Sequence, residues 1–231
     1  MQTLTRSPIG HNSNGPSGLN AAQSAYPELP NVLGWWDASD TASYTLNGTK
    51  VSQWNSRVGV NHFVQSTDSR RPTITENSLN SLRTINHSGG AVWLNLTTRL
   101  TNVRTAIIVM RWTDTTGAYR TIFGDTSNYD WHGGLAGGSL FDGTWASASV
   151  RGGDKYVNGV LTAGNLERYT SWRYMIFQTT ANTAIASLTD ERGDTSRTIK
   201  GDVAEIILMS SVITSTDRGA VNSYLSAKWG L

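Results

Sequence analysis

The sequence predicts an all-β protein: a two-sheet antiparallel sandwich or jelly roll with an extended N-terminal arm and one C-terminal α-helix. Three observations carry this prediction. Many short runs rich in β-branched and aromatic residues are bounded by Gly, Asn, Asp and Ser. A helical pattern of apolar residues occurs only near the C-terminus, and residues 1–30 lack the apolar patterning of the remainder. A chain of 231 residues is long enough for one large all-β domain.

The expected strands are spaced as in two-layer β-proteins. Within 155–162, Asn158-Gly159 lies between apolar residues and predicts a type I′ hairpin. The full set of expected strands is 33–38, 62–65, 82–86, 91–96, 104–112, 119–124, 145–151, 155–162, 173–179, 184–189 and 203–210.

The expected helix lies in "TSTDRGAVNSYLSAKWGL". Thr214 or Ser215 can cap it, and Asp217 favours the positive end of the helix dipole. Gly230 stands where a helix normally ends. One buried stripe is expected, formed by Val221, Tyr224, Leu225 and Lys228/Trp229.

Residues 1–30 are rich in Gly, Asn, Ser, Ala and Pro, with Arg6 and Glu28 as the charged exceptions. By itself such a segment buries too little apolar surface to offset its ordering entropy. Two interpretations follow: a disordered tail, or an arm that becomes ordered against a neighbouring subunit. The chain is therefore divided into an arm, 1–30, and a domain, 31–231. The expected anchors of the arm are Leu4, Ile9, Leu19 and Tyr26.

Composition argues against several classes of protein. Cysteine is absent, which excludes disulfides, thiolate metal sites and cysteine nucleophiles. The net charge is +2 and the basic residues are dispersed, with Arg70-Arg71 the only basic doublet, so no nucleic-acid partner is expected. The longest apolar runs, 106–110 and 204–209, are of strand length and predict no membrane span. No secretory leader is expected at the N-terminus.

Two ends of the chain carry a recognisable pattern: "LGWWDASDTASYTLNGTKVSQWNS" (33–56) with "RRPTI" (70–74), and "GDVAEIILMSSVITSTDRGAVNSYLSAKWGL" (201–231). Together with the "YVNGVL" hairpin they resemble the LamG-like jelly-roll domains of the concanavalin A-like lectin/glucanase superfamily, over residues 32–231. Such domains are frequent in tailed-phage structural proteins and in bacterial surface proteins. The resemblance implies the fold, but the fold hosts lectins, glycosidases, adhesins and structural modules alike.

Catalytic patterns are missing from the sequence. The glucanases of this superfamily place several acidic residues along one strand, whereas Glu205 is followed by Ile207 and Met209 at the alternate positions. The acidic cluster 189–194 has the composition of an exposed turn, and Glu205 is expected to be a structural carboxylate hydrogen-bonded within or between sheets. No Gly-x-Ser-x-Gly elbow or phosphate-binding glycine motif occurs, and the four histidines lie in no catalytic motif. The chain is therefore not expected to be an enzyme.

No cofactor is expected, and calcium stays open. No Asp-x-Asp-x-Asp string is present. The resemblance implies that calcium could bind at the rim of the sandwich, whereas the alternative is that the aspartates cap turns. The candidate ligands are Asp37, Asp40, Asp125, Asp130 and Asp142.

The segment "YDWHGGLAGGSLFDGTW" (129–145) holds the best candidate for sugar binding. Aromatic faces stack on sugar rings, and polar side chains supply hydrogen bonds. The alternative is a Gly-rich strand-and-turn segment whose glycines permit close backbone approach. The candidate glycan-binding residues are Tyr129, Trp131, His132, Asp142 and Trp145. Most of the remaining tryptophans lie in expected strands or in the helix, where core positions are expected.

These observations together predict a non-enzymatic virion protein of a tailed phage. The specific hypothesis is a capsid decoration (cement) protein, a homo-oligomer whose arm contacts neighbouring capsid or tail proteins. The alternative is a glycan-binding receptor-recognition module of a tail fibre or of a bacterial surface protein. The expected location is the virion, after synthesis in the host cytoplasm.

Overall fold

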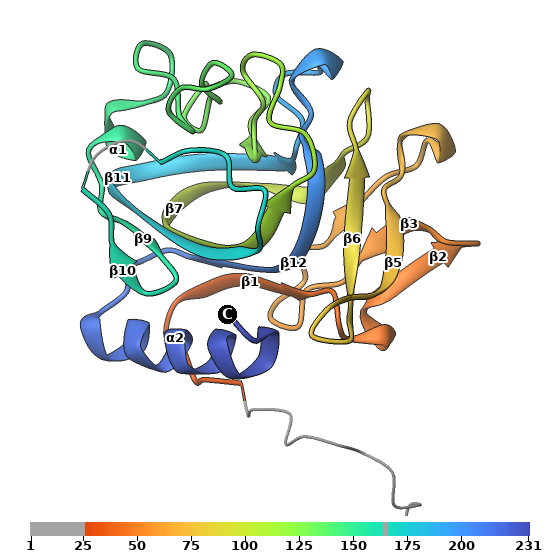
Figure 1. The fold of residues 1–231 in the computed structure, drawn as a ribbon, viewed down its shortest axis with the longest axis horizontal. Helices are drawn as coiled ribbons and strands as arrows, with labels where there is room; N and C mark the ends of the chain where they lie inside the picture. The colour runs from red at the N-terminus through yellow and green to blue at the C-terminus, as the bar shows by residue number, and fades with distance from the viewer. Residues whose placement is uncertain (1–25, 164–165) are drawn as a thin grey trace, which may run out of the picture.

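The computed structural model describes residues 26–163 and 166–231, which form an antiparallel β-structure followed by a long C-terminal helix (Figure 1). The strands are β1 (Val32–Asp37), β2 (Tyr44–Asn47), β3 (Lys50–Trp54), β4 (Phe63–Val64), β5 (Thr73–Leu79), β6 (Leu82–Ser88), β7 (Leu94–Trp112), β8 (Phe123–Gly124), β9 (Lys155–Val157), β10 (Val160–Leu161), β11 (Arg173–Leu188) and β12 (Lys200–Met209). The helices are α1 (Ala148–Arg151) and α2 (Ser215–Trp229), with single 3-10 turns at Thr41–Ser43, Asp68–Arg70 and Thr195–Arg197.

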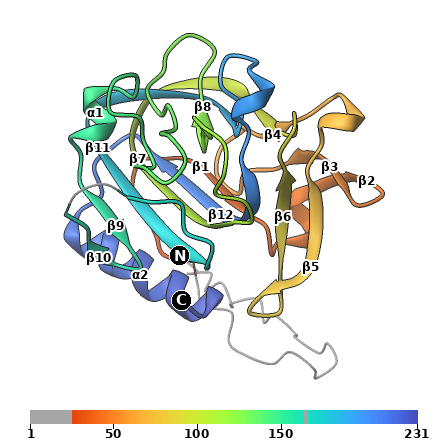
Figure 2. The same cartoon turned by 45° about the horizontal axis from the view of Figure 1, so that its top comes forward.

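Six strands close into a ring in the order β12, β6, β5, β3, β4, β7, with β7 paired again to β12. β1 extends the sheet from β12, while β11, β9 and β10 extend it from β7 (Figure 2). All pairings between named strands are antiparallel. The predicted all-β class with a C-terminal helix is therefore confirmed at this level, in the form of a closed ring.

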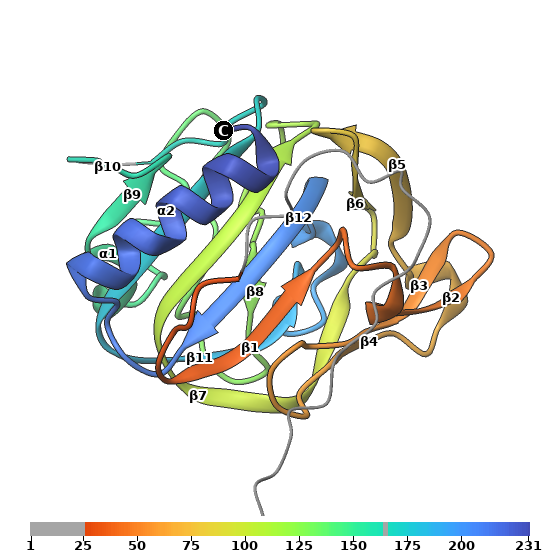
Figure 3. The same cartoon turned by 90° about the horizontal axis from the view of Figure 1, so that it is seen from below.

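Two apolar cores lie on opposite faces of the central strands. On β7, Ala106, Ile108 and Met110 join the core enclosed by the ring, whereas Ile107 and Val109 join a second core under α2. Alternation of side chains along a strand produces this division. Because both faces are covered, the run 106–110 is continuously apolar. Figure 3 shows α2 lying across the outer face of the sheet.

The helix α2 begins and ends as the sequence predicts. The hydroxyl of Thr214 accepts a hydrogen bond from the backbone N–H of Asp217 (3.1 Å). Gly230 adopts φ +70°, the left-handed conformation that favours glycine at a helix end. The expected stripe from Val221 to Trp229 is buried against the sheet. The hairpin prediction is also supported, because Asn158 and Gly159 both have positive φ, +47° and +80°.

Several expected strands differ in the structure. Residues 91–96 and 104–112 belong to the single strand β7, and residues 173–179 and 184–189 belong to β11. Of 119–124, only Phe123–Gly124 is a strand. The expected strand 145–151 is wrong: the hydroxyl of Ser147 accepts from the N–H of Val150 and caps the short helix α1 instead.

Tyr26 lies against its own chain. Its hydroxyl donates to the carboxylate of Asp37, and its ring lies 5.2 Å from that of Trp35 and 5.4 Å from that of Tyr224. The sequence predicts Tyr26 as an anchor on a neighbouring subunit. In the structure its contacts are instead with Asp37, which also accepts from Ser39 and pairs with Lys228, and with aromatic rings of β1 and α2. The other expected anchors, Leu4, Ile9 and Leu19, lie outside the described residues.

Candidate functional site

The connections that follow β7 and β11 lie on the side of the molecule away from α2 (Figure 1). Five of their residues line a small pocket. Residues 113–172, between β7 and β11, supply Tyr119, Tyr129, His132 and Trp145. The β11–β12 connection supplies Arg197. These five residues line a cavity of about 230 Å³, which we call the aromatic pocket.

A buried carboxylate organises the floor of the aromatic pocket. Glu191 Oε2 lies 2.6 Å from His132 Nδ1 and 2.8 Å from Arg197 Nη1. The side chains of His132 and Glu191 are 3% and 1% exposed, so the hydrogen bond is shielded from water. Because a carboxylate only accepts, Nδ1 is the donor in this contact, and Nε2 is the ring nitrogen that the contact leaves unused.

The backbone around this carboxylate is strained. Tyr119, Thr189 and Arg192 have φ of +58°, +69° and +57°, although none is glycine. Left-handed conformations of this kind cost of the order of 1–3 kcal/mol each and persist where surrounding contacts enforce them. Thr189 and Arg192 flank the segment that contains the buried Glu191.

Specific hydrogen bonds hold these strained residues. The N–H of Thr189 donates to Ile122 O and its hydroxyl to Val92 O, both at 2.8 Å. The N–H of Tyr119 donates to Gly134 O at 2.8 Å. These hydrogen bonds tie the strained residues to neighbouring connecting segments, as a preorganised site requires.

The glycines of 129–145 permit the close backbone contacts that the sequence predicts. A Cβ at Gly133 would lie 2.0 Å from Arg120 O, and one at Gly134 would lie 1.9 Å from Ser139 O. Only glycine fits such contacts. These positions place His132 on the inner side of the segment, next to Tyr119, whose ring lies 5.2 Å from the imidazole.

Asp142 positions Trp145. Its Oδ1 accepts from the N–H of Thr144 (2.8 Å) and from that of Trp145 (2.7 Å), which is an Asx-type turn. Burial acts to raise the pKa of Asp142, but these two N–H groups outweigh it and hold the pKa below its usual value. The Trp145 side chain is left 60% exposed, with its ring 5.9 Å from that of Tyr129.

Trp131 does not join the other four predicted site residues. Its side chain is 2% exposed and makes edge-to-face contacts with Phe123, Phe141 and Phe177 at 5.5, 5.9 and 6.1 Å. Its neighbour His132 faces the pocket, whereas Trp131 faces the core. The ring of Trp131 is thus unavailable to a ligand, which corrects its place in the predicted set.

Three residues of the pocket region were missed by the sequence prediction: Tyr119, Glu191 and Arg197. The cluster 189–194 was expected to be an exposed turn, but Glu191 is almost fully buried. Glu191 pairs with a histidine 59 residues away, and no motif connects the two. The signal in the sequence that could have pointed to Glu191 was the excess of charged residues in 189–194. In the structure, Asp194 of this cluster also contacts Arg197, with Oδ2 2.9 Å from Nε.

The candidate calcium ligands are dispersed and already engaged. Asp40 pairs with Arg57 (2.8 Å) and Asp125 with Arg99 (2.6 Å), while Asp130 accepts from the N–H of Ala184 (2.8 Å). Asp37 pairs with Lys228 (2.6 Å), and Asp142 caps its turn. Among residues 26–163 and 166–231, no three His, Cys, Asp or Glu side chains are grouped so that they could hold a metal ion.

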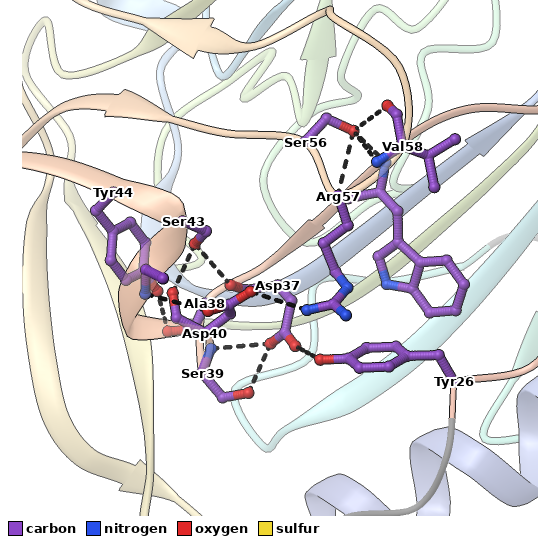
Figure 4. Close-up of polar contacts among 12 residues, drawn as sticks. Tyr26, Asp37, Ala38, Ser39, Asp40, Ser43, Tyr44, Ser56, Arg57 and Val58 are labelled. Atoms are coloured by element: carbon purple, nitrogen blue, oxygen red, sulfur yellow. Dashed lines mark hydrogen bonds and ion pairs between the residues drawn. The ribbon is translucent and has the colours of Figure 1, made fainter. Parts of the chain in front are cut away.

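A second polar cluster lies under α2 and involves Glu205. Its four acceptor contacts come from Trp35, Tyr224, Lys228 and Trp229. Glu205 is therefore structural, as predicted, but it bonds to the helix as well as within the sheet. Figure 4 shows the outer end of this cluster, where Tyr26 reaches Asp37 and Ser39 donates to the same carboxylate. We call Tyr26, Trp35, Asp37, Glu205, Tyr224, Lys228 and Trp229 the helix network.

A larger groove of about 850 Å³ runs beside this cluster, between residues 26–32 and the Arg57-Val58 turn. Two of its polar side chains are already paired: Tyr26 with Asp37, and Arg57 with Asp40. Arg57 also lies over the ring of Tyr26, 3.7 Å from its centroid. The groove presents mainly apolar surface, with the exposed carboxylate of Glu28 at its side.

Within the described part of the chain, none of the helices has the length and apolar character needed to cross a membrane. Comparison with known protein families, with curated proteins and with solved structures gives no match.

Proposed function

We propose that this chain is a non-enzymatic carbohydrate-binding module and that the aromatic pocket is its binding site. The observation that carries the proposal is the combination of aromatic walls with a preset hydrogen-bonding pair. Trp145, Tyr129 and Tyr119 offer ring faces, while His132 and Arg197 offer hydrogen-bonding nitrogens. Concave sites with apolar walls and a few fixed polar groups are the usual form of small-molecule sites.

The same geometry favours binding over catalysis. Hydrolysis of a glycosidic bond needs two carboxyl groups on either side of the bond. Glu191 is occupied by His132 and Arg197, and Asp142 is occupied by two backbone N–H groups. The hydroxyls that line the pocket are those of Tyr119 and Tyr129. These groups orient and recognise a sugar and supply no paired acid and nucleophile.

The proposed setting is a virion, in which the module recognises glycan on a host surface. The resemblance of residues 32–231 to LamG-like jelly-roll domains supports this setting, as does a surface rich in Ser, Thr and Asn with 16% charged residues. In this proposal the closed ring is a variant of the two-sheet jelly roll. The connections that form the pocket are the loops that such folds use for ligands.

A glycan array with the full chain tests the proposal. We expect the wild type to bind a defined group of glycans, and Trp145→Ala to lose most of that binding, because it removes the exposed stacking surface. Val60→Ala is the matched control, since Val60 is also exposed (87%) and does not line the pocket. Absence of array binding by the folded wild type would refute the proposed function.

A capsid decoration protein is a second proposal, and the position of Tyr26 supports it. The helix network holds Tyr26, so the segment before it joins the domain at a defined place beside α2. Deleting residues 1–25 leaves this contact intact. If the arm contacts capsid subunits, the deletion will abolish co-sedimentation with particles that lack the protein, while the thermal unfolding of the domain stays unchanged. Undiminished co-sedimentation would refute this second proposal.

A further inference from the structure

We infer that the aromatic pocket takes one neutral pyranose ring at the exposed end of a glycan, and that it discriminates against acidic sugars. This inference rests on the proposed function and names the class of ligand. Three features of the pocket carry it: its size, the inclination of its rings, and the state of its polar groups.

The size of the pocket suits one sugar ring. Its volume of about 230 Å³ is below the range of roughly 300–1,000 Å³ that is usual for drug-sized ligands. An extended oligosaccharide would need an open groove along several residues. Of its lining residues, His132 is 3% exposed and Trp145 is 60% exposed, so the imidazole lies at the buried side of the pocket and the indole at the solvent side. A pocket of this size fits a terminal ring better than an internal ring, which is flanked by further sugars.

The rings form walls at different inclinations. Tyr129 and Trp145 are inclined at 60°, Tyr129 and His132 at 85°, and Tyr119 and His132 at 34°. A flat platform of coplanar rings would suit successive sugars of a chain. Aromatic walls set at angles surround one sugar ring. One face of the sugar then stacks on an aromatic side chain, and the edge of the sugar meets the polar groups.

The polar groups of the floor select hydroxyl over carboxylate. Glu191 engages His132 Nδ1, so Nε2 is the imidazole nitrogen left for a ligand. A sugar hydroxyl both donates and accepts, so it can pair with Nε2 whichever role this nitrogen has, whereas a carboxylate can only accept. An acidic sugar placed there would also bring its carboxylate close to that of Glu191, whose Oε2 lies 2.6 Å from the same imidazole.

The charge around the floor acts in the same direction. The guanidinium of Arg197 is shared between Glu191 and Asp194, at 2.8 and 2.9 Å. Its positive charge is therefore compensated inside the protein. Two carboxylates close to the floor repel a third one brought by a ligand. The other nearby guanidinium, that of Arg192, lies over the outer ring of Tyr129 at 4.6 Å.

Isothermal titration of the full chain with three matched probes tests the inference. The probes are a galactose-terminated oligosaccharide, the same oligosaccharide capped by sialic acid, and a polymer in which the ring is internal. If the array selects a different neutral terminal sugar, it replaces galactose in all three. We expect binding of the first probe, and affinities about tenfold or more lower for the other two.

A substitution of Glu191 at the floor of the pocket tests its role in ligand selectivity without changing the size of the side chain. Glu191→Gln keeps the size of the side chain and an acceptor for His132 Nδ1 but removes the negative charge at the floor, so the preference for the neutral over the capped probe should fall. Val60→Ala should keep the preference of the wild type. Equal or tighter binding of the capped probe or the polymer by the wild type would overturn the inference and leave the proposed function standing. Failure to bind any glycan on the array or in titration would overturn both.

Discussion

The helix network and the aromatic pocket are each built around a buried glutamate, but they differ in how completely their polar groups are paired. In the helix network, Glu205 accepts from Trp35 Nε1 (2.5 Å), Trp229 Nε1 (2.6 Å), Tyr224 Oη (2.7 Å) and Lys228 Nζ (3.1 Å). Every acceptor position of this carboxylate is used. In the aromatic pocket, Glu191 binds His132 and Arg197, while Trp145 and the second nitrogen of the imidazole stay open to a ligand.

The backbones of the two regions differ in the same way. The helix network stands on β1, β12 and α2, and none of its residues has a positive φ, although the pairing of β12 with β7 shifts register next to Glu205. The pocket stands on connections with left-handed non-glycine residues. A polar cluster that is saturated and unstrained stabilises the architecture, whereas a cluster that is strained and incompletely paired is suited to binding. The predictions below test this contrast.

The largest effect is expected from Glu205→Ala. The change leaves two indole N–H groups and the hydroxyl of Tyr224 without their acceptor, and it removes one of the two carboxylates that pair with the buried Lys228. Lys228 and Glu205 are 6% and 1% exposed. Removal of one member of a buried ion pair costs about 3–5 kcal/mol. Urea denaturation will measure the lowered free energy of unfolding. A loss below about 1 kcal/mol would show that the network is not central to stability.

A comparable loss is expected on acidification through His87. Complete burial lowers the pKa of His87 to about 4. The unfolded chain therefore takes up a proton first, near pH 6.5, and the stability present above that pH is lost as the pH falls to about 4. The shift corresponds to about 3 kcal/mol.

His87 also connects this effect to the pocket, because its Nδ1 lies 3.4 Å from the hydroxyl of the strained Thr189. Denaturation curves of the wild type and of His87→Leu, collected between pH 7 and pH 4, will check the prediction. We expect the slope between these limits to flatten in the variant. An unchanged slope would assign the acid sensitivity to other groups.

A moderate effect is expected from Tyr26→Phe. The variant keeps the ring contacts with Trp35 and Tyr224 but removes the donor to Asp37. Hydrogen bonds to charged groups contribute about 1.5–3 kcal/mol, and the half-buried position of Tyr26 favours the lower value. Thermal unfolding will measure the loss. The pocket is remote from this contact, so glycan binding should not change.

The smallest expected effect is a gain in stability, whereas the preceding predictions are losses. Arg192 is exposed with φ +57°, so Arg192→Gly removes backbone strain and should stabilise the fold by about 0.5–1 kcal/mol. Thr216→Gly is the matched control at an exposed position of α2, where glycine should destabilise by about 1 kcal/mol. If both variants lose stability alike, the backbone of the pocket is not strained at this residue.

Local patterns made much of the fold predictable. The helix α2 carries its cap, its apolar stripe and its terminal glycine within one segment, and β12 is a continuous apolar run. The closed ring was not predictable, because β5 (Thr73–Leu79) is polar and its pairing with β3 rests on one register pair, Lys50 with Thr73. The ends of a ring meet through contacts distant in sequence, which local patterns do not encode.

The candidate site was predictable only in part, for a similar reason. Tyr129, His132, Asp142 and Trp145 lie in one short segment and could be grouped by composition. The sequence could not tell buried Trp131 from exposed Trp145, since the direction of each side chain depends on irregular backbone. Glu191 and Arg197 come from another connection and were hidden by their charged surroundings.

The most direct test of the contrast between the two regions is a two-dimensional NMR titration that follows the indole N–H signals. A galactose-terminated oligosaccharide, or the neutral terminal sugar that the array selects, is added to the full chain. We expect the signal of Trp145 to shift progressively with ligand, while those of Trp35 and Trp229, held by Glu205, stay in place. A stationary Trp145 signal under conditions of demonstrated binding, or shifts confined to Trp35 and Trp229, would contradict the assignment of the aromatic pocket as the binding site.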